Sequence, residues 1–383
     1  MRQAVLGAGL LLIGGALVLA GVLPIEDAAA VALRVWPILL FVVAITVVTE
    51  LAAEAGLFRV IAERAARHGL GRAWVLWIIV VGLAVLSTIF LSLDTTAVLL
   101  TPVVVLLARH VGVSPIPFAL TTVWLANTAS LLLPVSNLTN LLAQHELGGM
   151  SPLAFAALMA APAVVAIVIP CLVLFLVFRR NLLERFTPDE SGPVEDRVLF
   201  VTSAVVVALL IPLLVSGLPV WLPAGVGAAV LLVLFAVRRR SVIRFGLLPW
   251  KVVLLASGLF LVVEAGHSLG LDDLLAVVAG SGDDLAGLLR LSTTGALGSN
   301  LVDNLPAYLA LEPVADSPRR IAALLIGTNA GPLITPWASL ATLLWHDRLR
   351  ALDVEISWGR YALLGLLVVP LTIVPATIAL ALF

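Results

Sequence analysis

Charged residues are scarce in this sequence. Only 12% of its 383 residues are Asp, Glu, Lys or Arg, whereas 62% are hydrophobic. A soluble domain carries about 25% charged residues, so the chain has half of what a water-facing surface requires. This deficit excludes a soluble enzyme and a nucleic-acid-binding protein. It indicates an integral membrane protein in contact with lipid, and the net charge of −1 points to no charged partner.

Cysteine is nearly absent, since Cys171 is the only one. A single cysteine excludes a disulfide within the chain and a cysteine metal site. The histidines show no metal-ligand spacing either, and we expect His145, His267 and His346 in solvated loops. No metal centre and no cofactor is therefore expected. The sequence also lacks a Walker-type phosphate loop, so energy must come from an ion gradient or from a separate ATPase subunit.

Long apolar runs are abundant. Runs of about 20 residues suit membrane-spanning helices, because barrel strands need only about 10 residues. The first run resembles a signal peptide but is long for one, so we expect a retained span. The pattern predicts an all-α polytopic protein with nine spans and two re-entrant helical hairpins. The expected spans cover residues 4–23, 31–49, 116–143, 152–178, 198–216, 220–237, 249–264, 321–345 and 359–382.

Two of these spans and both hairpins are interrupted in the middle. Pro134 and Pro336 break the spans 116–143 and 321–345, and polar clusters break the hairpins. Irregular backbone at membrane depth is tolerated only against protein or a water-filled cavity. The interruptions therefore predict two broken helices and two hairpin tips close to the membrane midplane. The hairpins are expected at residues 74–110 and 284–315.

Basic residues favour one side of the predicted membrane. If the N-terminus is cytoplasmic, all of the 22 Lys and Arg residues except Arg34, Arg290, Arg319 and Arg320 fall on or beside the inner side. Such a bias is typical of the cytoplasmic face of membrane proteins. Nine spans then place the C-terminus outside, in a protein of the plasma (inner) membrane.

Similar residues recur in the two halves of the chain, at a spacing that shrinks slowly along the sequence. Glu50 matches Glu264, Asp94 matches Asp303, and Asn127 matches Asn329. Matched segments run in opposite directions in the predicted topology, as in the inverted repeats of secondary transporters. We expect a first repeat at 1–180, a cytoplasmic linker at 181–197, and a linking span with the second repeat at 198–383. Glu50 and Glu264 end spans and are expected to be structural.

Polar residues inside a membrane are costly and mark ion or substrate paths. Asp94 and Asp303 are the only carboxylates expected at the hairpin tips, which makes them candidates for binding a proton or a cation. Hydroxyl and amide groups offer neutral donors and acceptors to a solute. Ser and Thr can instead bond their own backbone, and Asn can join helices. The candidate solute-binding residues are Ser92, Thr95, Thr96, Asn127, Thr128, Ser130, Ser136, Asn137, Asn140, Asn300, Asn304, Asn329, Gly331, Thr335, Ser339 and Thr342.

Three of these polar segments carry a family resemblance. Residues 327–345, 128–140 and 94–102 resemble the ion-transporter superfamily, and within it the ArsB-type arsenical-pump membrane proteins. The resemblance implies a transporter rather than an enzyme, with two scaffold regions and two mobile regions that move like an elevator. It also implies export of arsenite and antimonite, driven by proton exchange or by an ATPase subunit, and commonly a homodimer.

The two tips differ from the family patterns. The first reads Leu93-Asp94-Thr95 where ArsB-type proteins usually have Asn-Asp-Gly, and the second reads Asp303-Asn304 where they have paired Asn. Neither tip has the Ser-Asn-Thr of the dicarboxylate symporters. We expect a metalloid/proton antiporter with the two aspartates as proton carriers. A dicarboxylate transporter, which ionised tip carboxylates would disfavour, and a sodium/proton antiporter are the alternatives.

Overall fold

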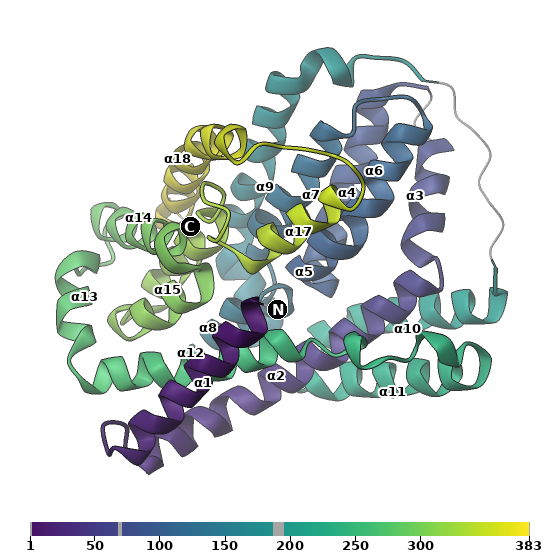
Figure 1. The fold of residues 1–383 in the computed structure, drawn as a ribbon. Helices are drawn as coiled ribbons and strands as arrows, with labels where there is room; N and C mark the ends of the chain where they lie inside the picture. Colours follow the sequence, from purple (N-terminus) through teal and green to yellow (C-terminus); the bar gives the residue numbers. More distant parts are fainter. Residues whose placement is uncertain (1, 68–70, 187–194, 383) are drawn as a thin grey trace.

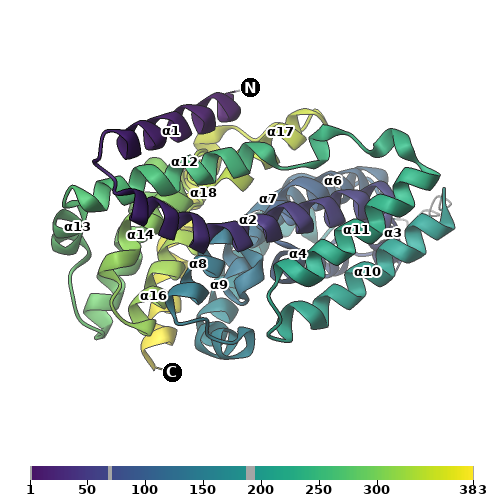
Figure 2. The ribbon, with the colours of Figure 1, turned by 90° about the horizontal axis from the view of Figure 1, so that it is seen from below.

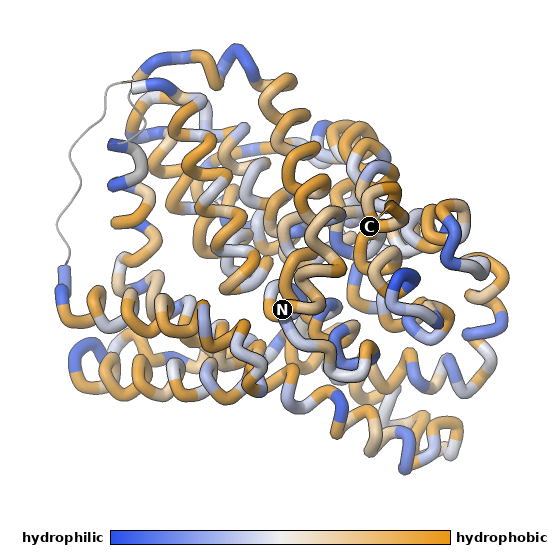
Figure 3. Tube along the Cα trace, turned by 180° about the vertical axis from the view of Figure 1, so that it is seen from behind, coloured by the Kyte–Doolittle hydropathy of each residue, from blue (hydrophilic) through white to orange (hydrophobic). Residues whose placement is uncertain are grey.

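The chain folds into helices joined by short connections. The computed structural model describes residues 2–67, 71–186 and 195–382, and in these ranges its only strand-like feature is an isolated bridge between Arg72 and Arg185. Hydrophobic residues cover most of the length of the helices, and hydrophilic residues gather at their ends and connections (Figure 3). The prediction of an all-helical membrane protein is confirmed.

The helices follow one another in a single chain order. They are α1 (Arg2–Leu19), α2 (Ile25–Glu54), α3 (Leu57–Arg67), α4 (Ala73–Leu91), α5 (Leu93–Thr95), α6 (Thr101–His110), α7 (Ile116–Thr128), α8 (Leu138–Glu146), α9 (Pro152–Leu182), α10 (Arg197–Val215), α11 (Trp221–Arg238), α12 (Trp250–Ser268), α13 (Leu271–Ala279), α14 (Leu285–Val302), α15 (Asn304–Leu311), α16 (Pro318–Leu325), α17 (Leu340–Arg350) and α18 (Trp358–Leu382). Two single π-helical turns, Thr96–Leu100 and Ile326–Ala330, follow α5 and α16 directly.

Eight segments are long and apolar enough to cross a membrane in the described part of the chain, whereas the sequence predicts nine spans. They are α2, α4, Leu93–His110, α9, α10, α11, α12 and α18. The difference arises at the interrupted segments, because the breaks leave pieces too short to qualify, and because α1 is short as well. Of the predicted linker 181–197, residues 187–194 lie outside the described residues.

The helices form two layers (Figure 1). One layer holds α1, α2, α10, α11 and α12, and the other holds α4–α9 and α14–α18. Within the first layer, α2 runs between the pair α1 and α12 and the pair α10 and α11 (Figure 2). The centre of the second layer is buried: every residue of α7 from Pro117 to Thr128 is inside the protein, as is the segment 320–330.

The first helix packs far along the chain. α1 lies against α12, and α11 lies against α2. Glycines permit the first of these contacts, since Gly7 and Gly14 face α12 at Leu254, Leu255 and Leu261. The sequence cluster of glycines between residues 7 and 15 thus serves close helix packing.

Gly258 of α12 gives a test of this packing. A Cβ atom at Gly258 would lie 2.6 Å from the backbone nitrogen of Leu11 in α1, so Gly258→Ala must push the two helices apart. We expect a loss of about 1–3 kcal/mol in the free energy of unfolding, the usual cost of overpacking. Gly9→Ala is the control, because nothing lies within 4 Å of its Cβ position. Equal melting temperatures of the two purified variants would contradict the prediction.

Helix boundaries recur at the spacings found in the sequence. α3 and α13 begin as far apart as Glu50 and Glu264, each after a glycine with positive φ, Gly56 (81°) and Gly270 (87°). α8 and α17 likewise begin at the spacing that separates the two asparagines of the broken spans. At the tips, however, the helices break at Ser92 and at Asp303. The prediction that Asp94 matches Asp303 is therefore wrong by two residues, because it aligned the acidic side chains rather than the breaks.

Three histidines lie in helices and not in the loops predicted for them. His267, in α12, contacts the carboxylate of Asp272 and lies 3.2 Å from the carbonyl oxygen of Leu309. His346, in α17, stacks on Trp358 with ring centroids 4.1 Å apart. His145 is exposed near the end of α8. The loop prediction failed because α12 and α17 continue beyond the apolar runs that define the expected spans.

Candidate solute site at the two helix breaks

A small cavity lies where the two helix breaks of the second layer meet α2 and α12. Its volume is about 80 Å³. A single water needs about 10–15 Å³ and drug-sized ligands occupy about 300–1,000 Å³, so the cavity suits a solute of few atoms. No Lys or Arg stands among the described residues that line it. Six predicted site residues line it: Ser92, Asp94, Asn137, Asp303, Asn304 and Ser339.

The two break residues share an unusual backbone conformation. Ser92 has φ 111° and ψ 160°, and Asp303 has φ 121° and ψ 155°. This region is populated almost only by glycine, and other residues there cost about 1–3 kcal/mol each. Each side chain caps the helix that follows: the N–H of Thr95 donates to the Ser92 hydroxyl (3.4 Å), and that of Leu305 donates to the Asp303 carboxylate (3.1 Å). Strain of this kind clusters at ligand clamps and active sites.

The two aspartates differ in how they are held. Asp94 lies in the first turn of α5, and no hydrogen bond or ion pair to its carboxylate occurs among the described residues. Asp303 is fixed by its cap and feels the charge of Asp94. Two like charges at one small cavity are compensated most simply by a bound proton or cation. The Ser339 hydroxyl, buried and without a partner in the described part, is a further polar group on the cavity wall.

Three of the predicted solute ligands instead join the two broken helices. The Asn137 amide donates to the side-chain oxygen of Asn329 (3.1 Å), and the Thr139 hydroxyl donates to the same oxygen (2.9 Å). The Asn329 amide in turn donates to the side-chain oxygen of Asn140 (2.6 Å). These bonds connect α8 to the π turn at 326–330. Only Asn137 of this asparagine cluster also reaches the cavity.

Asn300 holds the second break in shape. Its amide nitrogen donates to the carbonyl of Gly331 (2.8 Å), and its amide oxygen accepts from the N–H groups of Ile334 (3.1 Å) and Thr335 (3.0 Å). Backbone groups freed by the break are thereby satisfied without water, as the membrane interior demands. Since Asn300 lies one turn before Asp303, the same bonds fix the position of that carboxylate.

Most other predicted ligands lie behind the cavity wall. Thr95 lines a neighbouring cavity, and a Cβ at Gly331 would lie 2.2 Å from the carbonyl oxygen of Gly327, so this glycine serves packing. Thr335 bonds the backbone of Asn300. Thr96, Asn127, Thr128, Ser130, Ser136 and Thr342 have no exposed surface.

Thr46 is a site residue that the sequence reasoning missed. It lies in α2 and lines both the small cavity and its neighbour. It precedes Glu50 by one helical turn, so the two side chains share a face of α2. A lone hydroxyl in an apolar run was the available signal, and it was overlooked because such hydroxyls often bond only their own backbone, as Thr46 also does with Val42.

The helical layers, the broken helices and the small polar cavity define a membrane transport protein without an enzyme active site of its own. The sequence comparisons agree with this class. The chain belongs to the citrate transporter family (CitMHS), which matches residues 3–342.

Curated relatives and a solved structure extend the likeness. The chain is 32% identical to the "Arsenical pump membrane protein" of Escherichia coli K12, over 87% of this chain and 83% of that one. It is 30% identical to the protein of that name from Yersinia enterocolitica, over 91% and 86%. The crystal structure of the YdaH transporter of Alcanivorax borkumensis superposes with a TM-score of 0.62 at 18% identity, over 91% and 84%, which shows a shared fold. The resemblance to arsenical-pump membrane proteins of the ion-transporter superfamily is confirmed.

Proposed function

We propose that this protein exports arsenite and antimonite across the plasma membrane in exchange for protons. The observation that carries the proposal is the small cavity with two carboxylates and no basic side chain among its described lining residues. The relatives named arsenical pump membrane proteins support the same solutes. The cavity is the proposed solute site, and Asp94 and Asp303 are the proposed proton carriers.

The chemistry of the cavity fits a neutral trihydroxide, the main form of trivalent arsenite in water. A carboxylate accepts hydrogen bonds from the solute's hydroxyl groups, and a protonated carboxyl loses part of that accepting capacity. Proton and solute therefore compete for the oxygens of Asp94 and Asp303. Such competition is what an antiporter requires, because the site must carry one or the other across the membrane.

The proposed mechanism is movement of the second layer against the first. The cavity lies on the boundary between them, since α2 and α12 form one wall and the helix breaks form the other. We propose that the helix sets with recurring boundaries form an inverted repeat, and that residues 74–110 and 284–315 are re-entrant hairpins. The N-terminus would be cytoplasmic and the C-terminus outside. A homodimer and an ATPase subunit belong to this proposal as what the family resemblance implies.

Everted membrane vesicles test the function. Vesicles that contain the protein and are acidified inside should accumulate arsenite, because proton exit then drives solute entry. Collapse of the pH gradient with an uncoupler should abolish the accumulation. Uptake no greater than in vesicles without the protein would contradict the proposal. Antimonite, which has the same trihydroxide chemistry, should compete with arsenite.

A citrate or dicarboxylate transporter is the second candidate, because the family that matches residues 3–342 is described as a citrate transporter. The cavity opposes it, since an anion would meet two carboxylates and no cation among the described lining residues. In the same vesicles, stimulated uptake of citrate or succinate without arsenite uptake would favour this candidate. Sodium-driven pH changes without uptake of either solute would favour a sodium/proton antiporter.

A further inference from the structure

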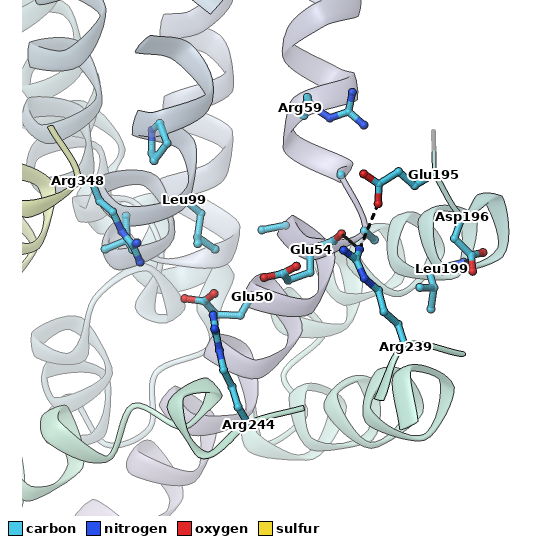
Figure 4. Close-up of a pocket in the computed structure, with 15 residues that line it drawn as sticks. Glu50, Glu54, Arg59, Leu99, Glu195, Asp196, Leu199, Arg239, Arg244 and Arg348 are labelled. Carbon is cyan, nitrogen blue, oxygen red and sulfur yellow. Dashed lines mark hydrogen bonds and ion pairs between the residues drawn. The ribbon is translucent and has the colours of Figure 1, made fainter. Parts of the chain in front are cut away.

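Three cavities lie in series between one face of the protein and the two aspartates. The outermost, which we term the vestibule, has a volume of about 440 Å³ and lies among α2, α3, α10 and the end of α11 (Figure 4). The middle cavity measures about 290 Å³, and the innermost is the solute site. Four arginines line the vestibule: Arg59, Arg239, Arg244 and Arg348. By the charge bias of the sequence, this basic face is the cytoplasmic one.

Neighbouring cavities share lining residues, so they form one path. The vestibule and the middle cavity share Glu50, Val98, Leu99 and Arg348. The middle cavity and the solute site share Thr46, Ser92, Asp94, Val252 and Leu340. A carboxylate therefore stands at each junction: Glu50 at the first and Asp94 at the second.

Glu50 is placed to exchange protons in both directions along this path. It lies near the end of α2, is partly buried, and points toward the vestibule between Arg244 and Arg348 (Figure 4). Both guanidinium groups act on its charge, but no ion pair within 4 Å holds Glu50 among the described residues. Its carboxylate is therefore free to gain and lose a proton. The middle cavity has room for several waters, each of which needs about 10–15 Å³.

The charged groups around Glu50 come from several elements. Arg348 of α17, Arg244 of the segment before α12, and Glu54 of α2 act on it directly. Lys251 of α12 and Asp94 of α5 line the middle cavity with it. Arg59, Glu195, Asp196 and Arg239 share the vestibule.

We propose that Glu50 is a proton-transfer residue that receives the proton released by Asp94 and passes it to the vestibule. The proton leaves the Asp94 carboxyl group through water of the middle cavity, binds the Glu50 carboxylate, and then leaves with vestibule water. No bond other than these O–H bonds forms or breaks. This inference rests on the proposed proton exchange, and it changes the expected role of Glu50 from structural to functional.

The test separates proton-coupled transport from solute exchange in proteoliposomes. Glu50→Gln should lower net arsenite uptake driven by a pH gradient at least tenfold, because the amide cannot carry a proton. Exchange of labelled for unlabelled arsenite at equal pH moves no net proton, so it should stay within twofold of wild type. Glu50→Asp should restore part of the net uptake. Glu54→Gln is the matched control, since Glu54 lies one turn on in the same helix and lines only the vestibule.

The outcomes that overturn the proposal are distinct. Unchanged net uptake in Glu50→Gln would show that the carboxylate is dispensable, and an equal loss of uptake and exchange would show a structural role. Glu54→Gln should keep both activities within twofold, and a selective loss of net uptake there would also contradict the assignment to Glu50. If wild-type protein transports no arsenite, the proposed function fails and takes the proton role of Glu50 with it.

Cysteine labelling tests the path without any transported solute. In a Cys171→Ser background, Thr46→Cys should react with a small charged methanethiosulfonate reagent in everted vesicles and not in right-side-out vesicles. Asp273→Cys, at an exposed position of α13, should show the opposite preference. Failure of Thr46→Cys to react from the basic face would contradict the path, whatever the transported solute is.

Discussion

Replacement of Asp94 or Asp303 by Asn should lower proton-driven arsenite uptake by about 100-fold or more, an effect of about 2.7 kcal/mol on the limiting barrier. An amide has nearly the shape of a carboxyl group but cannot release or bind the proton that the exchange requires. No other Asp or Glu stands among the described residues that line the cavity, so no nearby group can substitute. Initial rates of uptake into vesicles with a fixed pH gradient measure the effect.

The same variants should fold normally. The Asp94 carboxylate has no hydrogen-bond partner in the described part of the chain, so Asp94→Asn removes no contact. At position 303 Asn caps a helix as well as Asp does, and it tolerates positive φ better than most residues. Asp303→Ala is the informative contrast, because it also removes the cap over Leu305 and should reduce the yield of folded protein. Normal uptake by both Asn variants would remove the proton-carrier assignment.

Removal of Arg34 should cost about 2–4 kcal/mol in the free energy of unfolding, because it leaves a buried carboxylate without a countercharge. The guanidinium of Arg34, in α2, lies 2.5 and 2.6 Å from the two oxygens of Glu312, whose side chain is only 6% exposed. The Tyr308 hydroxyl donates to the same carboxylate at 2.8 Å. The pair joins the first layer to the end of α15. The melting temperature of purified Arg34→Ala in detergent measures the loss.

A double variant tells this cost from a general effect of mutation. When Glu312→Leu accompanies Arg34→Ala, no unpaired charge is left inside the protein, so the double variant should be more stable than Arg34→Ala alone. Glu195→Gln breaks the exposed pair with Arg239 and should change the free energy of unfolding by no more than about 0.5 kcal/mol. A double variant less stable than Arg34→Ala would contradict this account of the buried pair.

Much of the architecture followed from the apolar pattern. Breaks in apolar runs marked Ser92, Pro134, Asp303 and Pro336 as places where helices stop, because a polar or proline residue in such a run has few other uses. The conformation of each break could not be predicted, since nothing in the sequence forces Ser92 or Asp303 to positive φ. For that reason the acidic residues were aligned with one another and not with the breaks.

The roles of the asparagines could not be read from the sequence. The amides of Asn137, Asn140 and Asn329 could equally bind a solute or one another, and their partners lie in the other half of the chain. Glu50 was misjudged for a related reason. It was placed at the end of a span at 31–49, whereas α2 continues to Glu54 because surrounding protein accepts its polar last turn. The cavities beside Glu50 form from segments that only the fold brings together.

The pairing of α1 with α12 has a consequence for synthesis. A ribosome adds about 5–20 residues per second, and about 250 residues separate the end of α1 from the end of α12, so the first helix waits about 10–50 s for its partner. During that time its glycine face has only lipid for company. A short, glycine-rich helix that must stay in place alone is a natural point of quality control, because a nascent chain that loses α1 to the aqueous phase cannot complete the first layer.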